Sequence, residues 1–199
     1  NRIRSNVAHA FSPRHAREVR PLMQKVIAEL LDDWAPKGAF DFAYFASLFP
    51  VSVMCGVLGV STQAIAPLRQ ALEDQFKSLT MDLSVKPLFM AGWDVMWDFV
   101  DNLVKEREVR GLNDPDALLD ALIGAKQAGH IDDTDLRFII LTLFFGGFDT
   151  SKNQLTMTML LLLERPEIYA RCAEDLDYCG KVIRESLRHS GIASPFRQV

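Results

Sequence analysis

The chain has 199 residues, of which 49% are hydrophobic and 24% charged, a composition typical of one folded domain and not of a disordered segment. Its net charge of −4 predicts no general attraction to nucleic acid. No apolar run reaches the roughly 18 residues of a membrane span, and three cysteines without metal-ligand spacing or a secretory signal indicate a reducing compartment, the cytoplasm.

Helices are predicted along nearly the whole chain, because apolar residues recur at helical spacing and alternating strand patterns are rare. Ser12 and Pro13 are typical of a helix start, and Asp41 is placed to cap the next helix. In chain order, the first predicted helices cover residues 13–34, 42–58, 63–79, 87–109 and 114–129.

The longest predicted helix follows, over residues 133–164, with Asp132 or Asp133 as its cap. It would be about 48 Å long at 1.5 Å per residue. Apolar residues lie on nearly every side of it, so we expect it to be buried through the middle of the fold. A helix from Pro166 and another over 176–189 complete what we predict to be one mainly α-helical unit, residues 1–199.

The long helix contains an unusual run, Gly146 to Thr150, with the sequence Gly-Gly-Phe-Asp-Thr. Each glycine costs about 1 kcal/mol relative to alanine inside a helix, and a buried apolar helix accepts an acid or a hydroxyl only with partners. The run indicates a group close to the backbone or a local bend. A bend that suits a packed neighbour, with Asp149 paired to a distant cation, explains the run equally well. Thr150 is also placed to donate a hydrogen bond to the Gly146 carbonyl.

A second feature is the pair Glu185 and Arg188, an acid and a base three residues apart on one helix face. Taken alone, this pair is typical of a surface salt bridge. Together, however, the two features resemble the cytochrome P-450 family of haem-thiolate monooxygenases, in the style of its soluble bacterial members. The glycine run resembles the oxygen-binding groove of that family's central helix, and Glu185 with Arg188 resembles its structural pair. Further segments that resemble the family lie at residues 3–4, 10–14, 49–60 and 164–167.

The resemblance covers essentially the whole chain and implies the helical middle portion of that fold, with most of its β part absent. It implies that Gly146 and Gly147 leave room for haem and dioxygen, and that Asp149 and Thr150 deliver protons to the bound oxygen. It also implies that Asn153 holds water in this relay, and that Arg188 is buried against Glu185. The remaining roles that it implies are Arg4 and Arg197 at the haem propionates, and Phe145, Phe148, Ile192, Ala193 and Phe196 along the substrate pocket.

The implied partners are a small hydrophobic substrate and a ferredoxin-type electron donor. Residues 1–25 carry six basic side chains and one acidic side chain, a charge of +5, which leaves −9 for the rest of the chain. Composition alone leaves open whether this basic segment binds an anionic partner or is a solvated helix face. The resemblance implies that it docks the electron donor.

The resemblance also implies that an iron-ligating cysteine lies in a Phe-x-x-Gly-x-x-x-Cys-x-Gly loop. Cys55, Cys172 and Cys179 do not fit this pattern. We therefore expect the ligand beyond Val199, no metal ligand within the chain, and no activity from this fragment alone. Without haem, its apolar faces would be exposed, which predicts self-association.

Other readings fit less well. A di-iron helical bundle needs two Glu-x-x-His pairs, and the chain has only the reversed His15-x-x-Glu18. A terpene-cyclase-like enzyme would carry Asp-Asp-x-x-Asp, whereas residues 132–135 are better explained as a helix cap. A truncated, non-catalytic helical module that self-associates or binds a partner chain remains open as an alternative.

Overall fold

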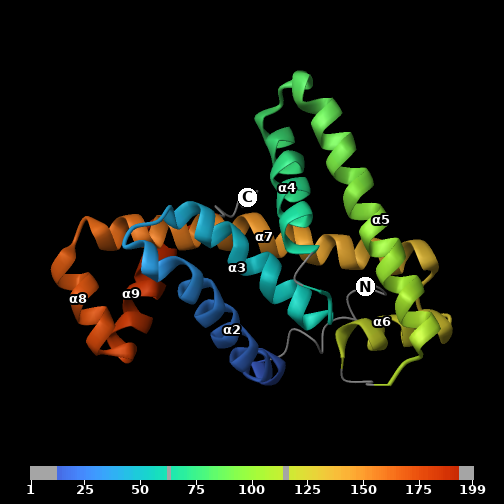
Figure 1. Ribbon diagram of the computed structural model, residues 1–199, viewed down its shortest axis with the longest axis horizontal. Helices are drawn as coiled ribbons and strands as arrows, with labels where there is room; N and C mark the ends of the chain where they lie inside the picture. Colours follow the sequence, from blue (N-terminus) through green and yellow to red (C-terminus); the bar gives the residue numbers. More distant parts are fainter. Residues whose placement is uncertain (1–12, 62–63, 114–116, 193–199) are drawn as a thin grey trace, which may run out of the picture.

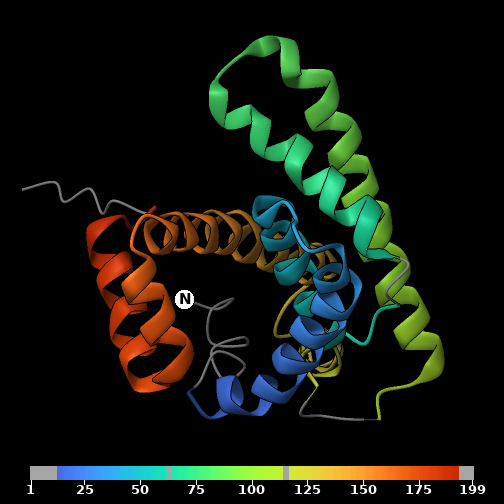
Figure 2. The ribbon, with the colours of Figure 1, turned by 60° about the vertical axis from the view of Figure 1, so that its left-hand side comes forward.

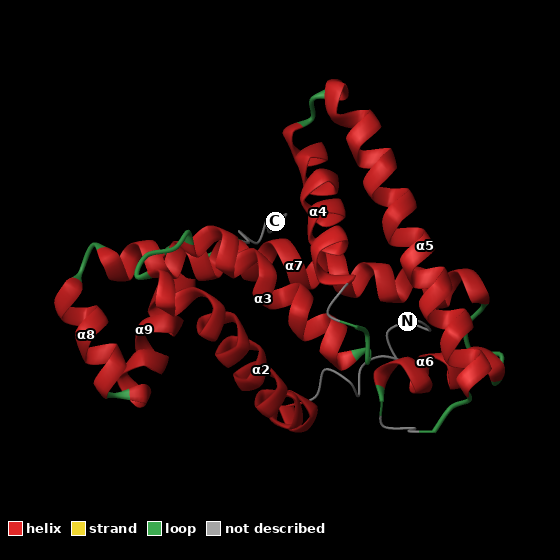
Figure 3. Ribbon diagram, viewed as in Figure 1, coloured by secondary structure: helices red, strands yellow, loops and turns green. Residues whose placement is uncertain are grey.

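The computed structural model describes residues 13–61, 64–113 and 117–192. These residues are almost entirely helical and contain no strand, which confirms the predicted fold class (Figure 3). The α-helices are α2 (Pro13–Trp34), α3 (Phe42–Val57), α4 (Ile65–Phe76), α5 (Lys86–Arg110), α6 (Leu118–Gln127), α7 (Asp133–Leu163), α8 (Pro166–Glu174) and α9 (Leu176–His189). Short 3-10 turns are η2 (Ala35–Lys37), η4 (Lys77–Thr80) and η5 (Leu83–Val85).

The caps predicted at Asp41 and Asp132 are present, whereas Ser12 lies outside the described residues. The Asp41 side chain accepts hydrogen bonds from the backbone N–H groups of Ala43 and Tyr44, at 2.8 and 3.1 Å. Asp132 accepts from the backbone N–H of Asp135, whose own side chain accepts from the backbone of Asp132. This reciprocal arrangement satisfies two N–H groups that a helix start leaves without partners. It sets the first residue of α7, the helix that organises the fold.

The long helix α7 lies at the centre of the molecule, and α3 packs along it (Figure 1). The α4–α5 hairpin stands out from α7 on one side, and the α8–α9 pair folds back at its C-terminal end (Figures 1 and 2). The hydrophobic core lies where α3, α4, α5 and α6 meet the first half of α7. Its fully buried side chains include Leu72, Met96, Leu122, Ile140 and Phe144.

The prediction that α7 is buried along its whole length is correct only for its first half. Most apolar side chains between Leu136 and Phe148 are buried, whereas from Asp149 onward only Leu162 is. The second half has fewer neighbours among the described residues, and Leu163 and Leu187 are exposed at this end of the molecule. The self-association expected from such faces stays a prediction.

A buried cation ties three helices together at the start of α7. Arg137 is nearly buried and pairs with Asp101 of α5 at 2.7 Å and with Asp133 at the start of its own helix. Lys126 of α6 reaches the same Asp133 at 2.6 Å. Hydrogen bonds from Arg137 and Lys126 lower the pKa of Asp133 from 3.8 to about 2. The folded state therefore holds this carboxyl in its ionised form.

A smaller polar contact joins the second half of α7 to α9. Ser186 is 4% exposed, and its hydroxyl lies 2.7 Å from the hydroxyl of Thr158. The Gln154 amide nitrogen lies 3.4 Å from both of these oxygens. Ser186 is the one residue of α9 that is buried among those described, so this contact fixes which face of α9 meets α7.

We expect Asp133→Asn to flatten the acid dependence of stability. The contribution of Asp133 is fully present above about pH 4 and is lost as the pH falls towards 2, because its pKa is lowered in the folded state. Melting temperatures of the variant should therefore change less than those of the native protein across this range. Asp177→Asn, an exposed aspartate in the first turn of α9 that pairs with no described cation, is the control. Parallel melting curves for the native and Asp133→Asn proteins would contradict the assignment.

Ser186→Ala should lower the free energy of unfolding by about 1 to 2 kcal/mol, because it removes the hydroxyl partner of Thr158 in a buried contact. Thr142→Ala removes a hydroxyl at an exposed position of α7 and should change stability by no more than about 0.5 kcal/mol. Urea denaturation of both variants provides the measurement. Equal effects would show that the α7–α9 contact contributes no net stability.

Candidate functional site

The two glycines of α7 border open space. A Cβ atom built on Gly146 or Gly147 would meet no atom within 4 Å, apart from the helix's own backbone, in the part of the chain that the structure describes. At Gly92, by contrast, the same atom would lie 2.8 Å from the backbone carbonyl oxygen of Ala71. Gly92 is therefore required by a packed helix, and Gly146 and Gly147 are not. The reading of the glycine run as a bend for a packed neighbour loses its support.

The polar side chains that follow lie within one helical turn of each other. The Thr150 hydroxyl donates a hydrogen bond of 2.6 Å to the Gly146 carbonyl oxygen, as predicted. The Asp149 carboxylate accepts one of 2.9 Å from the Asn153 side chain, and it forms no ion pair with a described residue. The predicted pairing of Asp149 with a distant cation is thus not seen. Helix α7 continues through this run as an unbroken α-helix.

A cleft of about 480 Å³ opens beside Thr150, between α7 and the end of α9. Apolar side chains of both helices form much of its wall, and Ile192, predicted to face substrate, is part of it. Its complete lining is Thr150, Ser151, Gln154, Leu155, Leu187, Gly191 and Ile192. The structure therefore brings a hydroxyl, an amide and an apolar wall together next to the glycines.

The two phenylalanines of the glycine run have different environments. Phe148 is 1% exposed, and its ring packs at 6.2 Å from that of Phe76 in the core. It lies four residues after Phe144, on the same buried face of α7, and its place along a substrate pocket stays a prediction. Phe145 is only partly buried and stacks on Trp93 at 6.4 Å. It lies on the side of α7 that faces the α4–α5 hairpin.

Glu185 and Arg188 form the expected pair, but at the surface. Two hydrogen bonds of 2.8 and 2.6 Å join the guanidinium to the carboxylate, and they lower the pKa of Glu185. The side chains of Arg188 and Glu185 are 70% and 60% exposed, so the expected burial is wrong here. The face of α9 that meets α7 carries Ser186 instead. In this setting the pair contributes little to stability.

Sequence reasoning missed Gln154. It lies one turn after Thr150, lines the same cleft, and reaches Thr158 and Ser186 across the α7–α9 contact. Its side-chain oxygen is buried and has no hydrogen-bond partner among the described residues. The four-residue spacing from Thr150 was the available signal, since it places both side chains on one helix face.

Four of the predicted site residues lie outside the described part of the chain: Arg4, Ala193, Phe196 and Arg197.

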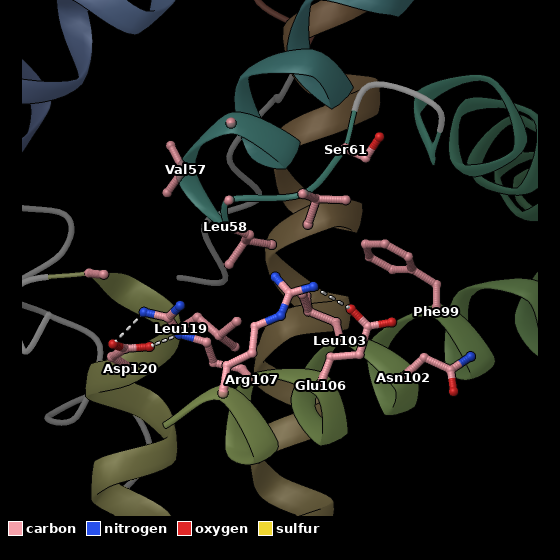
Figure 4. Close-up of a pocket in the computed structure, with 15 residues that line it drawn as sticks. Val57, Leu58, Ser61, Phe99, Asn102, Leu103, Glu106, Arg107, Leu119 and Asp120 are labelled. Atoms are coloured by element: carbon pink, nitrogen blue, oxygen red, sulfur yellow. Dashed lines mark hydrogen bonds and ion pairs between the residues drawn. The ribbon is translucent and has the colours of Figure 1, made fainter. Parts of the chain in front are cut away.

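A further pocket, of about 710 Å³, lies where the end of α3 meets α5 and α6 (Figure 4). Phe99 and Leu119 form part of its wall, and the Arg107 guanidinium bonds to Asp120 on one side, with one contact of 2.7 Å. None of the predicted site residues lines it. It is thus separate from the glycine run.

Two of the described cysteines, Cys55 and Cys172, are poor candidates for a thiolate ligand. Burial raises the pKa of Cys55 to about 12, so its thiol stays protonated near neutral pH. Cys172 is also buried, and burial raises its pKa. In the described ranges, no three His, Cys, Asp or Glu side chains lie close enough together to hold a metal ion. A separate observation is that the described helices include no candidate membrane span. Among the described residues, the side of α7 at Gly146 and Gly147 offers the open space that a flat cofactor would need.

Comparison with known proteins agrees with this geometry. The family model for cytochrome P-450 matches residues 61–192, more than half of the chain. Luteothin monooxygenase of Streptomyces thioluteus is 27% identical over 95% of this chain, and nocardicin C N-oxygenase of Nocardia uniformis subsp. tsuyamanensis is 29% identical over 98%. The matched regions are 46% and 48% of those proteins, so the chain spans about half the length of these relatives.

Solved structures give the same answer for the fold. Cytochrome P-450epoK bound to epothilone B superimposes with a TM-score of 0.84 at 19% identity, over 96% of this chain and 49% of that one. The cytochrome P-450 enzyme CxnD, described as forming a C–S bond in chuangxinmycin biosynthesis, has a TM-score of 0.80 at 25% identity, over 96% and 46%. The fold, the open glycine run and the family match converge: the chain belongs to the cytochrome P-450 family.

Proposed function

We propose that this chain is part of a longer protein, a haem-dependent monooxygenase that acts on a small hydrophobic substrate. In that protein it would form the side of the haem pocket on which dioxygen binds. The observation that carries the proposal is the open backbone edge at Gly146 and Gly147, with the Thr150 hydroxyl one turn away. A flat cofactor and a diatomic ligand need this combination of free space and a nearby hydroxyl. Membership of the family supports haem as that cofactor.

Haem, when bound, would supply the redox chemistry by which dioxygen, two electrons and two protons yield an oxygenated substrate and water. The residues of this chain would manage the protons. Asp149 is within reach of solvent and would take them up, and Asn153 holds the Asp149 carboxylate through its amide. Thr150, whose own proton points to the Gly146 carbonyl, has a hydroxyl oxygen free to accept and pass on a hydrogen bond.

The apolar character of the nearby side chains supports a hydrophobic substrate. Leu155, Leu187 and Ile192 line the cleft beside Thr150. Phe145 lies on the side of α7 that faces α5, where it stacks on Trp93. For electron supply, we propose a ferredoxin-type donor at the basic N-terminal face. The exposed side chains of Arg17, Arg20 and Lys25 on α2 support this docking face. We therefore propose that the whole protein acts in the cytoplasm, together with its reduced electron donor.

The parent protein, extended to include the cysteine-ligand loop, should bind haem and give the reduced carbon-monoxide spectrum of thiolate-ligated iron. This outcome follows from the proposal that the open edge of α7 at Gly146 and Gly147 borders the haem, which membership of the family supports. Absorption spectroscopy after purification is the measurement. A spectrum of histidine-ligated haem, or no haem at all under conditions in which the protein folds, would overturn the proposed function.

Thr150→Ala should leave substrate binding near its native level and release most of the consumed electrons as peroxide, because the proton relay loses its last hydroxyl. Product formed per reduced cofactor consumed should fall by at least about tenfold, because loss of a positioned proton-transfer group typically slows its step by about 10²- to 10⁴-fold. Thr150→Ser keeps the hydroxyl and is the matched control. Unchanged coupling in the alanine variant would remove Thr150 from the relay.

A further inference from the structure

Helices α8 and α9 pack against each other at the C-terminal end of α7 (Figures 1 and 2). Each of the two helices carries one cysteine, and both cysteines are free thiols. Among the described residues of α8, only Cys172 is buried, at 7% exposure. Cys179 lies in the first half of α9 and is partly exposed. A solvent-borne reagent therefore reaches Cys179 more easily than Cys172.

Helical spacing places both cysteines on the inner faces of this helix pair. Cys179, Val182 and Ser186 follow one another at intervals of three and four residues, so they lie on one face of α9. Ser186 is buried on this face, where α9 meets α7. On α8, Cys172 lies one turn after the partly buried Ile168. The two thiols thus belong to the faces by which the helices pack.

The residues directly before the two cysteines are in contact across the same junction. The Arg171 guanidinium lies 3.9 Å from the centre of the Tyr178 ring. A single residue, Asp175, connects the helices, and its side chain caps α9 by accepting a hydrogen bond of 2.9 Å from the backbone N–H of Tyr178. Burial raises the pKa of Cys172, and the Cys179 thiol raises it further through its charge and a hydrogen bond. The two thiols are therefore neighbours in the folded chain.

Two neighbouring thiols can complete a reaction that a single thiol cannot, namely reversible oxidation to a disulfide. In a reducing compartment such a bond is typical of redox sensing and not of a permanent structural link. Cys55 provides the contrast within the same chain. It is 1% exposed in the core of the molecule, and burial raises its pKa to about 12, so it stays a protonated thiol near neutral pH.

We propose that Cys172 and Cys179 form a redox-active pair that hydrogen peroxide converts to a disulfide. In the first step, the Cys179 sulfur attacks one peroxide oxygen, the O–O bond breaks, and Cys179 becomes a sulfenic acid as water leaves. In the second step, the Cys172 sulfur attacks the Cys179 sulfur, the S–O bond breaks, and a second water leaves. The two thiols lose two electrons and two protons in all, and one peroxide is reduced to two waters.

The disulfide would tie α8 to α9 on the faces by which they pack. Because the end of α9 lines the cleft beside Thr150, the bond would fix α8 against the helix that forms one wall of that cleft. A monooxygenase whose coupling fails releases peroxide, so the proposed function is one source of the oxidant. The reaction of the two thiols with peroxide itself needs no haem and goes beyond that function.

The test uses the parent protein, first reduced, then treated with a small excess of hydrogen peroxide, unfolded in an alkylating reagent and digested with trypsin. Cleavage after Arg171 and Lys181 gives one peptide, residues 172–181, that contains both cysteines. Mass spectrometry should find this peptide without alkyl groups and lacking two hydrogen atoms, and dithiothreitol should reverse the change. Cys55, the internal control, should be fully alkylated in the same sample.

Dimedone, a reagent that captures sulfenic acids, identifies the thiol that reacts first. In the Cys172→Ser protein, it should label Cys179 at least about tenfold more than in the native protein, because no second thiol removes the sulfenic acid. Cys179→Ser should give neither a disulfide nor label at Cys172, because Cys172 is buried. Melting curves show whether each variant is folded, and Cys172→Ala replaces Cys172→Ser if the hydroxyl prevents folding.

Three results would overturn the proposed pair. They are alkylation of both cysteines in the peptide after peroxide treatment, a disulfide between either cysteine and a different one, and equal dimedone labelling of Cys179 in the native and Cys172→Ser proteins. A disulfide that forms only when the protein is treated in urea would also contradict it, since the fold would then not bring the thiols together. A parent protein that binds no haem but forms the disulfide would count against the monooxygenase function alone.

Discussion

The burial of the first half of α7 is the constraint on which the rest of the structure depends. Phe144 and Phe148 are enclosed by neighbouring helices, and Arg137 is held by two carboxylates at the start of the helix. These contacts fix the rotation of α7 about its own axis. Once that rotation is set, Gly146, Gly147 and Thr150 must face the side that the neighbouring helices leave open. The position of the candidate site is thus a consequence of core packing on the other side of the helix.

The helices and their caps could be predicted because their signals are local. Asp41 and Asp132 are short acceptors directly before apolar periodic segments, and both accept backbone hydrogen bonds as expected. The predicted helix over 63–79 was less accurate: α4 ends at Phe76 and continues as the 3-10 turn η4. Helix ends without a strong cap depend on tertiary contacts, which a single sequence does not reveal.

The site was predictable in part for the same reason. Glycine content and the Thr150 hydrogen bond are properties of one helical turn. The surroundings of Phe148 and of Arg188 depend instead on which face of a helix meets its neighbour. Spacing of three residues predicts that Glu185 and Arg188 touch, and they do, but it contains no information on whether the pair faces α7 or solvent. The ring contacts of Trp93 and Trp97 with Phe138 join residues of α5 and α7 that are about 40 positions apart, so only the fold brings them together.

The close approach at Gly92 has a mechanical consequence. A methyl group at this position would press against the Ala71 carbonyl oxygen, so α4 and α5 touch through their backbones and leave no room for sliding side chains. Such a joint is stiff. If the α4–α5 hairpin moves to admit a ligand, it should therefore move as one rigid body, and the backbone should bend only where the hairpin meets α3 and α7. Phe145 and Trp93, one on each side of that junction, would be the first rings to part.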